Sequence, residues 1–296
     1  MSKTTGCLRL MRPANIVTSV ADVLAGIAIS GLFRTQLFQT GYVANILLLC
    51  LSTIGLYGGG VVFNDVFDSA LDKIERPERP IPSGLISVRE ASLLGGGLLV
   101  GGILTAFLSN YISGVIAFLI AIAALVYNRW SKHHTVIGPL NMGLCRGLNL
   151  LLGISILPSA LYSWWGLAAI PIIYIASITM ISRGEVHGGS RTILYLACLL
   201  YSLVIGFILY FSFGKGTVLY SLFFLLPFAW MIFRPLITAI REPVGRNIGR
   251  AVKAGVIALI LMNAAWAAAF GSIYAAILIV LLLPLSIKLG KMFAIT

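Results

Sequence analysis

Long apolar runs alternate with short polar turns along the chain. Ten such runs can be read, at about residues 15–33, 42–63, 92–109, 112–128, 138–157, 164–181, 193–213, 217–233, 251–270 and 272–289. Each is close to the ~20 residues that an α-helix needs to cross a bilayer, and barrel strands would instead alternate polar and apolar residues. The pattern predicts an all-α polytopic membrane protein, one domain over residues 1–296 with nine or ten transmembrane helices.

Two pairs of runs, 92–109 with 112–128 and 251–270 with 272–289, are separated by very short turns and predict helical hairpins. Composition agrees with a membrane protein. The chain is 59% hydrophobic and 10% charged, whereas soluble domains carry about 25% charged residues. No stretch remains that would form a soluble domain.

Basic residues are concentrated in alternate turns. If the N terminus lies inside, 18 of the 21 Lys and Arg residues fall on the cytoplasmic side, Arg34 and Lys215 fall on the other side, and Arg146 lies within a run. This asymmetry follows the positive-inside rule. It predicts an N-in, multi-pass protein whose long polar loops, at 64–91, 129–137, 182–191 and 234–250, are cytoplasmic. It also explains the net charge of +12 without nucleic acid as a partner.

Five of the nine acidic residues lie between Asp65 and Glu78, at the end of the second run. On a helix, Asn64, Asp68 and Asp72 share one broad face, where like charges repel. Mg²⁺ would remove that repulsion and keep coordination positions open for phosphate oxygens. The alternative is a solvated loop whose acids pair with the nearby cations Lys73, Arg76 and Arg79.

These residues carry a resemblance to a known family. Asn64-Asp65-x-x-Asp68-x-x-x-Asp72, followed by Arg76-Pro77-x-Arg79-Pro80-Ile81-Pro82-x-Gly84-x-Ile86-Ser87, resembles the first signature of the UbiA superfamily of intramembrane prenyltransferases. The opening Leu10-x-Arg12-Pro13-x-Asn15 is similar to the same family, and so are Tyr127, Asn128 and Lys132 at the end of the fourth run. Overall, the sequence looks most like the EboC branch of UbiA-like proteins.

The resemblance implies a mechanism and a set of roles. An isoprenyl diphosphate enters a cavity from the membrane, Mg²⁺ bridges its diphosphate to the acidic motifs, and an unknown acceptor captures the allylic cation. The implied metal ligands are Asn64, Asp65, Asp68, Asp72 and Glu185. The implied catalytic residues are Asp68, Asp72, Lys132 and Glu185. The implied diphosphate-binding residues are Arg76, Arg79, Arg129, Lys132 and Arg146.

The sequence departs from the family pattern after the sixth run. A second aspartate-rich motif is expected there, but residues 181–191 contain no Asp, and Glu185 is their one carboxylate. His187 is a further candidate ligand or proton acceptor. Either one Mg²⁺ suffices, or the substrate binds differently, or prenyl transfer is lost. The alternative function is therefore a non-catalytic or transport-associated membrane protein that binds a lipid or an anionic metabolite with the retained acidic motif.

Two charges lie inside apolar runs and need partners. Asp22 is in the first run and Arg146 in the fifth, at similar depths from the cytoplasmic side. Unpaired charges inside a membrane are costly, so the two are expected to form an ion pair. Such a pair either seals the helix bundle or lines the cavity and contacts a polar substrate.

Overall fold

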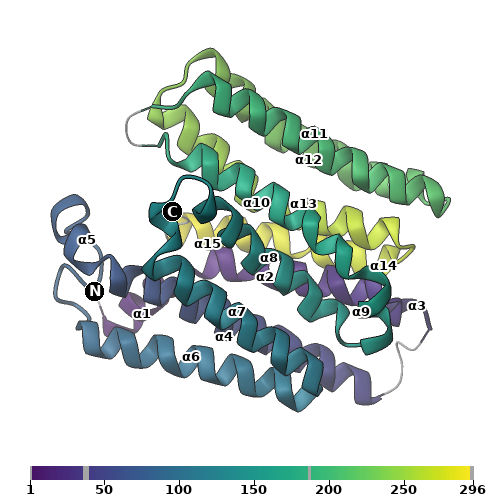
Figure 1. Cartoon of the computed structure of the whole chain (residues 1–296), viewed down its shortest axis with the longest axis horizontal. Helices are drawn as coiled ribbons and strands as arrows, with labels where there is room; N and C mark the ends of the chain where they lie inside the picture. The colour runs from purple at the N-terminus through teal and green to yellow at the C-terminus, as the bar shows by residue number, and fades with distance from the viewer. Residues whose placement is uncertain (1, 36–39, 186–187, 294–296) are drawn as a thin grey trace.

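The computed structural model is helical throughout and describes residues 2–35, 40–185 and 188–293 (Figure 1). His187 lies outside the described residues. The elements, in chain order, are α1 (Lys3–Met11), α2 (Pro13–Ser30), α3 (Leu32–Thr35), α4 (Thr40–Phe67), α5 (Ser69–Glu75), α6 (Val88–Ser109), α7 (Tyr111–Arg129), η1 (Ser131–His133), α8 (Ile137–Ile154), α9 (Pro158–Trp164), η2 (Trp165–Ala168), α10 (Ala169–Ser182), α11 (Arg191–Gly214), α12 (Val218–Arg241), α13 (Gly245–Ala269), α14 (Ile273–Val280) and α15 (Leu282–Met292).

In the described part of the chain, nine helical segments are long and apolar enough to cross a membrane. One of them joins α9, η2 and α10 (Pro158–Ser182), and another joins α14 and α15 (Ile273–Met292). The remaining predicted run is α8, an 18-residue helix that Asn141, Arg146 and Asn149 make more polar. The prediction of nine or ten membrane helices is confirmed, and the N-in orientation remains a prediction.

The predicted hairpins are also present. Only Asn110 separates α6 from α7, and its side chain caps α7 by accepting a hydrogen bond from the Ser113 amide at 2.9 Å. Its amide group also donates to the carbonyl of Ser155 at 3.1 Å. A polar residue at a helix start satisfies amides that have no partner within the helix, so this one side chain closes the turn and joins it to the end of α8.

The helices pack around α2 and α13, which are the most buried spans. Figure 1 shows α11 and α12 along one side of the molecule and α6 along the other, with α2, α8 and α13 between them. α2 packs against α4, α8, α13 and α15. The outer helices therefore carry the apolar surface that faces lipid, and the polar residues of the inner helices face one another.

A close crossing joins α2 to α8. A Cβ atom added at Gly26 would lie 2.3 Å from the carbonyl oxygen of Leu150, and one added at Gly153 would lie 2.2 Å from that of Val23. Only glycine allows backbones to approach this closely. Because Asp22 lies one turn before Gly26, and Arg146 two turns before Gly153, the crossing places these two charges at the same level of the bundle.

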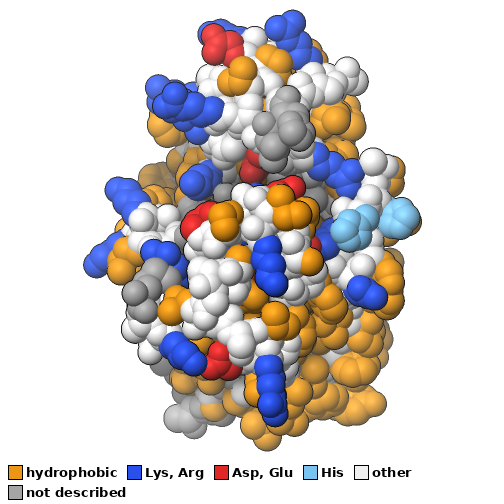
Figure 2. Space-filling view, turned by 90° about the vertical axis from the view of Figure 1, so that its left-hand side faces the viewer, with side chains coloured by type: hydrophobic (Ala, Val, Ile, Leu, Met, Phe, Trp, Pro, Cys, Tyr) orange, Lys and Arg blue, Asp and Glu red, His pale blue; other side chains and the backbone are white. Residues whose placement is uncertain are grey.

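The four long polar loops meet at one end of the molecule. Lys132 contacts Asp68, and Arg183 donates to the carbonyl of His134 at 2.5 Å. The amide of Gly189 donates to the carbonyl of Pro243 at 3.1 Å. Figure 2 views this end, where Lys and Arg side chains surround a region that also holds acidic groups. Residues from loops that lie far apart in the sequence are thus brought together.

Candidate active site

The acidic stretch forms a nearly continuous helix with a break at Asp68. α4 ends at Phe67 and α5 begins at Ser69, and Asp68 between them has φ −88° and ψ 1°. Backbone hydrogen bonds still run from Asp68 to Asn64 at 3.0 Å and from Asp72 to Asp68 at 2.8 Å. The four-residue register therefore persists across the break, as the spacing of these side chains predicts.

Two of the aspartates are buried and bound to arginines. Asp65 accepts from Arg12 Nη2 at 2.9 Å and from Arg79 Nη1 at 3.3 Å, and Asp72 accepts from Arg79 Nη1 at 2.7 Å. Both aspartates are only 4% exposed. A buried carboxylate without a partner would be strongly destabilising. Arg79 therefore ties the loop after α5 back to the acidic helix.

Asp68 is the more accessible aspartate, and its partner is Lys132 from η1. Next to it, Asn64 donates to Asn128 Oδ1 at 3.2 Å, and Asn128 in turn donates to the carbonyl of Gly60 at 2.7 Å. These contacts orient the side-chain amide of Asn64. They also join the end of α4 to the end of α7.

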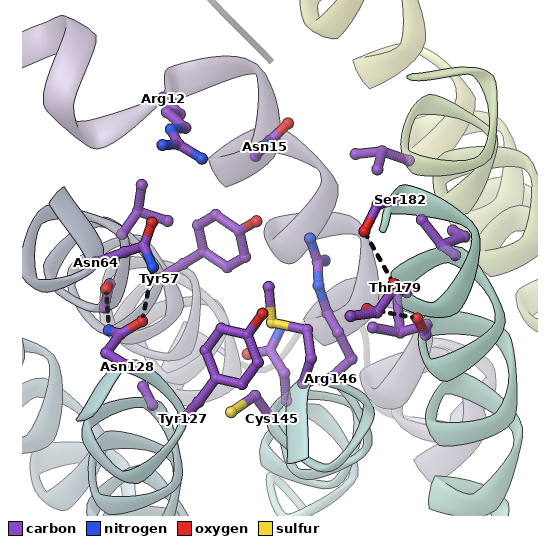
Figure 3. Close-up of a pocket in the computed structure, with 18 of the residues that line it drawn as sticks. Arg12, Asn15, Tyr57, Asn64, Tyr127, Asn128, Cys145, Arg146, Thr179 and Ser182 are labelled. Atoms are coloured by element: carbon purple, nitrogen blue, oxygen red, sulfur yellow. Dashed lines mark hydrogen bonds between the residues drawn. The ribbon is translucent and has the colours of Figure 1, made fainter. Parts of the chain in front are cut away.

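A cavity of about 420 Å³ lies between α2, α4, α7, α8, α10 and α13 (Figure 3). At the end where the loops meet, its polar lining includes Arg12, Asn64, Arg76, Ser182 and Glu185. Deeper in the bundle, its polar lining includes Thr53, Tyr57, Arg146 and Asn149. Its apolar lining includes Leu56, Ile120, Ile175, Val256 and Leu259. The cavity thus has two polar regions and an apolar wall.

Glu185 brings the segment after α10 into the same cavity as Asn64 and Arg76. Among the described residues, its Oε1 atom is buried and has no hydrogen-bond partner. Burial raises the pKa of the Glu185 carboxyl above its usual value, and the nearby charges of Arg76 and Lys253 oppose this rise. A buried oxygen without a partner is costly, so this atom is suited to bind a ligand or a cation.

The predicted ion pair is present, and it also borders the cavity. Arg146 Nη1 lies 2.6 Å from Asp22 Oδ2, and Arg146 Nη2 donates to Thr18 at 2.8 Å. Asp22 also accepts from Asn149 at 3.2 Å and from Asn263 at 2.7 Å. Since Arg146 and Asn149 line the cavity, the pair joins the helices and exposes polar groups to the cavity at the same time.

The oxygen donors at the loop end have the chemistry that Mg²⁺ prefers. Over the described ranges, however, no three His, Cys, Asp or Glu residues are clustered as a ready-made metal site. The three aspartates are held by basic side chains instead. The unpartnered oxygen of Glu185 and the amide of Asn64 both lie at the cavity. The donor set fits a magnesium ion whose binding competes with the aspartates' present partners.

Not every predicted site residue lies at the cavity. Of the implied diphosphate ligands, Arg76 and Arg146 line it. Arg79 is bound to the aspartates, Lys132 is bound to Asp68, and Arg129 is exposed at the end of α7. Their assignment to the diphosphate remains a prediction.

Sequence reasoning also missed residues that line the cavity. Tyr57 and Thr53 project into it from the middle of α4, and Ser182 ends α10 beside it. They carry no charge, and single hydroxyl groups are common within membrane helices, so no pattern distinguished them. Arg12 was named only for its resemblance to the family opening, yet it lines the cavity and binds Asp65.

The fold and the site define a class of protein: a polytopic helical membrane protein with a polar, arginine-lined cavity at one end of its bundle. The model of the UbiA prenyltransferase family matches residues 23–247. This is well over half of the chain, and the chain therefore belongs to the UbiA prenyltransferase family.

Relatives of known function are similar over part of the chain. The digeranylgeranylglyceryl phosphate synthase of Methanothrix thermoacetophila is 33% identical over 175 residues, which is 59% of this chain and 59% of that protein. The synthase of Metallosphaera sedula is 29% identical over 181 residues, 61% of each chain. The chain thus spans about three fifths of the length of the curated relatives it matches.

Solved structures share the fold. A structure from work on digeranylgeranylglyceryl phosphate synthase in membranes superposes with a TM-score of 0.67 at 22% identity, covering 93% of this chain and all of that one. A UbiA homologue from Archaeoglobus fulgidus bound to GPP and Mg²⁺ gives a TM-score of 0.62 at 18% identity, covering 86% of this chain and 99% of that one. The comparisons do not separate the EboC branch from other branches, which remains a prediction.

Proposed function

We propose that this protein is a magnesium-dependent membrane prenyltransferase, which moves an isoprenyl group from a polyprenyl diphosphate to an acceptor within the bilayer. One observation carries the proposal most directly. Asn64 from the acidic helix and Glu185 from the segment after α10 line one cavity together with Arg76. Two separate oxygen-donor segments and an arginine at one cavity end suit a metal-bound diphosphate.

Each part of the site then has a role. Asn64, Asp65, Asp68, Asp72 and Glu185 would hold magnesium, which supplies positive charge to the departing diphosphate when bound. Arg76 would bind diphosphate oxygens directly, because an arginine can donate to two oxygens at once. Arg79 and Lys132 stand beside the same carboxylates and supply further positive charge. Arg129, exposed at the end of α7, is a further candidate for this role.

The apolar wall suits the remainder of the substrate. Residues such as Leu56, Ile175 and Leu259 would contact the hydrocarbon chain and exclude water from the reacting carbon. Transfer breaks the bond between that carbon and the diphosphate oxygen, and both electrons leave with the diphosphate. The acceptor supplies an electron pair for the new bond and loses a proton. Fixed charges in such a low-dielectric site act strongly on the departing group.

The test is magnesium-dependent release of diphosphate from a panel of isoprenyl diphosphates by the purified protein. The Asp68→Ala variant should lose release by about 100-fold or more, by analogy with the loss of a single charge-stabilising group elsewhere. Glu75→Gln is the matched control, because Glu75 is exposed on the same short helix as Asp72. Release that is unaffected by Asp68→Ala would refute the metal assignment.

A second function has its own supporting observation. The three aspartates are fully engaged by basic side chains, and Glu185 is the one carboxylate of the segment after α10. A protein that binds a lipid or an anionic metabolite without turning it over would need no more than this. Tight binding of an isoprenyl diphosphate without diphosphate release in the same assay would favour this alternative.

A further inference from the structure

The cavity contains a second polar region that the diphosphate does not need. Thr53 lies eleven residues before Asn64 on α4, which is about 16 Å along the helix axis at 1.5 Å per residue. Tyr57 lies seven residues before Asn64, about 10 Å away on the same scale. Arg146 and Asn149 face this deeper region from α8. Thr53 donates to Asn149 at 2.7 Å, and Asn149 donates to Ser19 and Asp22, so these two side chains already have partners. A hydrocarbon tail has no use for the remaining groups, Tyr57 and Arg146, so the deeper region is suited to another polar molecule.

Arg146 presents hydrogen-bond donors there and little net charge. It is 5% exposed and lies 2.6 Å from Asp22, which is 1% exposed. Asp22 also accepts from Asn149 and Asn263, so the carboxylate is held firmly beside the guanidinium. A guanidinium has five N–H donors. The bonds to Asp22 and Thr18 use two of them, and the side chain of Tyr57 is a further hydrogen-bond partner. Donors remain for a ligand on the cavity side.

Two tyrosines complete this region. The guanidinium of Arg146 lies over the ring of Tyr57 at 4.7 Å from its centroid. Figure 3 shows the hydroxyl ends of Tyr57 and Tyr127 directed toward the same space as that guanidinium. A tyrosine hydroxyl both donates and accepts hydrogen bonds, whereas arginine only donates. Together they can satisfy both the oxygen and the proton of a ligand hydroxyl group.

Charge then decides between a neutral and an anionic ligand. An anion that contacts Arg146 would also lie close to Asp22, and like charges repel strongly where water is excluded. A neutral oxygen accepts the same hydrogen bonds without that repulsion. At the loop end, by contrast, Arg76 forms no ion pair with any described residue, so an anion is favoured there.

We infer that the region around Arg146, Tyr57 and Tyr127 is the acceptor subsite and that it selects a neutral, hydroxyl-bearing head group. This inference rests on the proposed function, and it assigns Arg146 to the acceptor in place of the diphosphate. In the transfer step, the acceptor oxygen forms the bond to the first carbon of the isoprenyl chain. The bond from that carbon to diphosphate breaks, and the hydroxyl proton passes to the released diphosphate.

Cys145 provides a binding readout that needs no turnover. It lines the cavity next to Arg146, and replacing Cys7, Cys50 and Cys198 by Ser leaves it as the sole thiol. Two pairs of probes each contain a neutral molecule and an anion of similar carbon skeleton. The first pair is 1-O-butylglycerol and its 3-phosphate, and the second is phenol and benzoate. The rate of Cys145 alkylation by a small uncharged maleimide is measured at increasing probe concentrations and at alkaline pH, because the thiolate is the form that reacts. A protein with Cys50 as the sole thiol is the control, because Cys50 does not line this cavity.

The neutral member of at least one pair should slow Cys145 alkylation at a concentration at least about tenfold lower than its anionic partner needs. Alkylation of the Cys50 control should not respond. Equal protection within both pairs, stronger protection by the anions, or no protection at all would overturn the inference.

Charge variants separate recognition from mere support of the fold. Asp22→Asn leaves Arg146 without its compensating charge and should shift the preference toward the anionic probes by at least about tenfold. That variant also risks misfolding, because an unpaired buried charge is destabilising. The double variant Asp22→Asn with Arg146→Gln contains no charge there and should fold, while protection by the neutral probe weakens by about tenfold. Wild-type selectivity in the double variant would overturn the inference.

The two hypotheses fail differently. If isoprenyl diphosphates release diphosphate in a magnesium-dependent manner but no neutral probe protects Cys145, the acceptor subsite is wrong and the proposed function stands. If neutral probes protect Cys145 but diphosphate is never released, the region stands as a binding site for a neutral head group, and its role as an acceptor subsite falls with the proposed function.

Discussion

The guanidinium of Arg79 donates to the carboxylate of Asp72 across 2.7 Å, which ties the loop after α5 back to the helix that precedes it. The same nitrogen lies 3.3 Å from Asp65, a carboxylate that also binds Arg12. Arg79 thus bridges two buried acids, and together with Arg12 it balances their two negative charges.

Replacing Arg79 tests this balance of charge. Arg79→Gln should lower the free energy of unfolding by about 3 kcal/mol, because it leaves buried carboxylates without their cation. Thermal unfolding in detergent measures the change. Arg89→Gln, which alters an exposed arginine near the start of α6, is the control and should have little effect. Adding Asp72→Asn to Arg79→Gln should recover part of the loss, and a further loss would contradict the pairing.

We expect Lys132 to affect the rate of diphosphate release more than the stability of the fold. Lys132→Gln removes the partner of the half-buried Asp68, so the expected change in unfolding free energy is only about 1 kcal/mol. Diphosphate release should fall by about 100-fold, because a cation beside the departing group is lost. Steady-state kinetics with a geranylgeranyl diphosphate probe measures this. A loss of stability without a loss of release would show that Lys132 has a structural role only.

Glu185 should make stability depend on pH. Burial raises the pKa of the Glu185 carboxyl in the folded protein above its usual value, so the folded state holds this proton to higher pH than the unfolded state does. Stability from this group is fully present below the unfolded pKa and is lost as pH rises through the raised folded pKa. Unfolding of the wild type and of Glu185→Gln, compared in EDTA, measures the difference. If the stability of the two proteins changed in the same way with pH, the raised pKa of Glu185 would be contradicted.

The glycine crossing should be sensitive to a single methyl group. Gly153→Ala places a Cβ 2.2 Å from the carbonyl oxygen of Val23, so α2 and α8 must separate. The free energy of unfolding should fall by about 1–3 kcal/mol or more. The ion pair between Asp22 and Arg146 should weaken as the two helices separate. Gly206→Ala is the matched control, since a Cβ there meets nothing within 4 Å. Equal unfolding temperatures for the two variants would refute the close contact.

The N-in orientation can be tested by labelling single cysteines in a background that lacks the natural thiols. Ser83→Cys lies in the connection between α5 and α6, and Tyr274→Cys lies at the start of α14, where the native side chain is 83% exposed. With the N terminus inside, an impermeant maleimide should label Tyr274→Cys in intact cells and Ser83→Cys only after permeabilisation. The reverse pattern would invert the topology.

The sequence by itself determined the helices and the position of the acidic motif. Hydrophobic length is a local property, because a run of about 20 apolar residues must form a helix when no water can satisfy its backbone. The ten runs therefore became helices, including α8, in which Arg146 lowers the hydropathy. The spacing of Asn64, Asp68 and Asp72 survived the break between α4 and α5 for the same reason, since helical register depends on near neighbours.

Only the tertiary structure decided which charges meet. The sequence placed Asp22 and Arg146 at similar depths, but the close approach of α2 and α8 at Gly26 and Gly153 sets their 2.6 Å contact. Likewise, the sequence offers Arg79 only as one of three basic partners for the acids, and the packing decides that it binds Asp72. No local pattern shows that Glu185 shares a cavity with Asn64. Such contacts depend on how helices far apart in the sequence pack and on where each loop returns, and hydropathy and spacing along one segment carry no information about either.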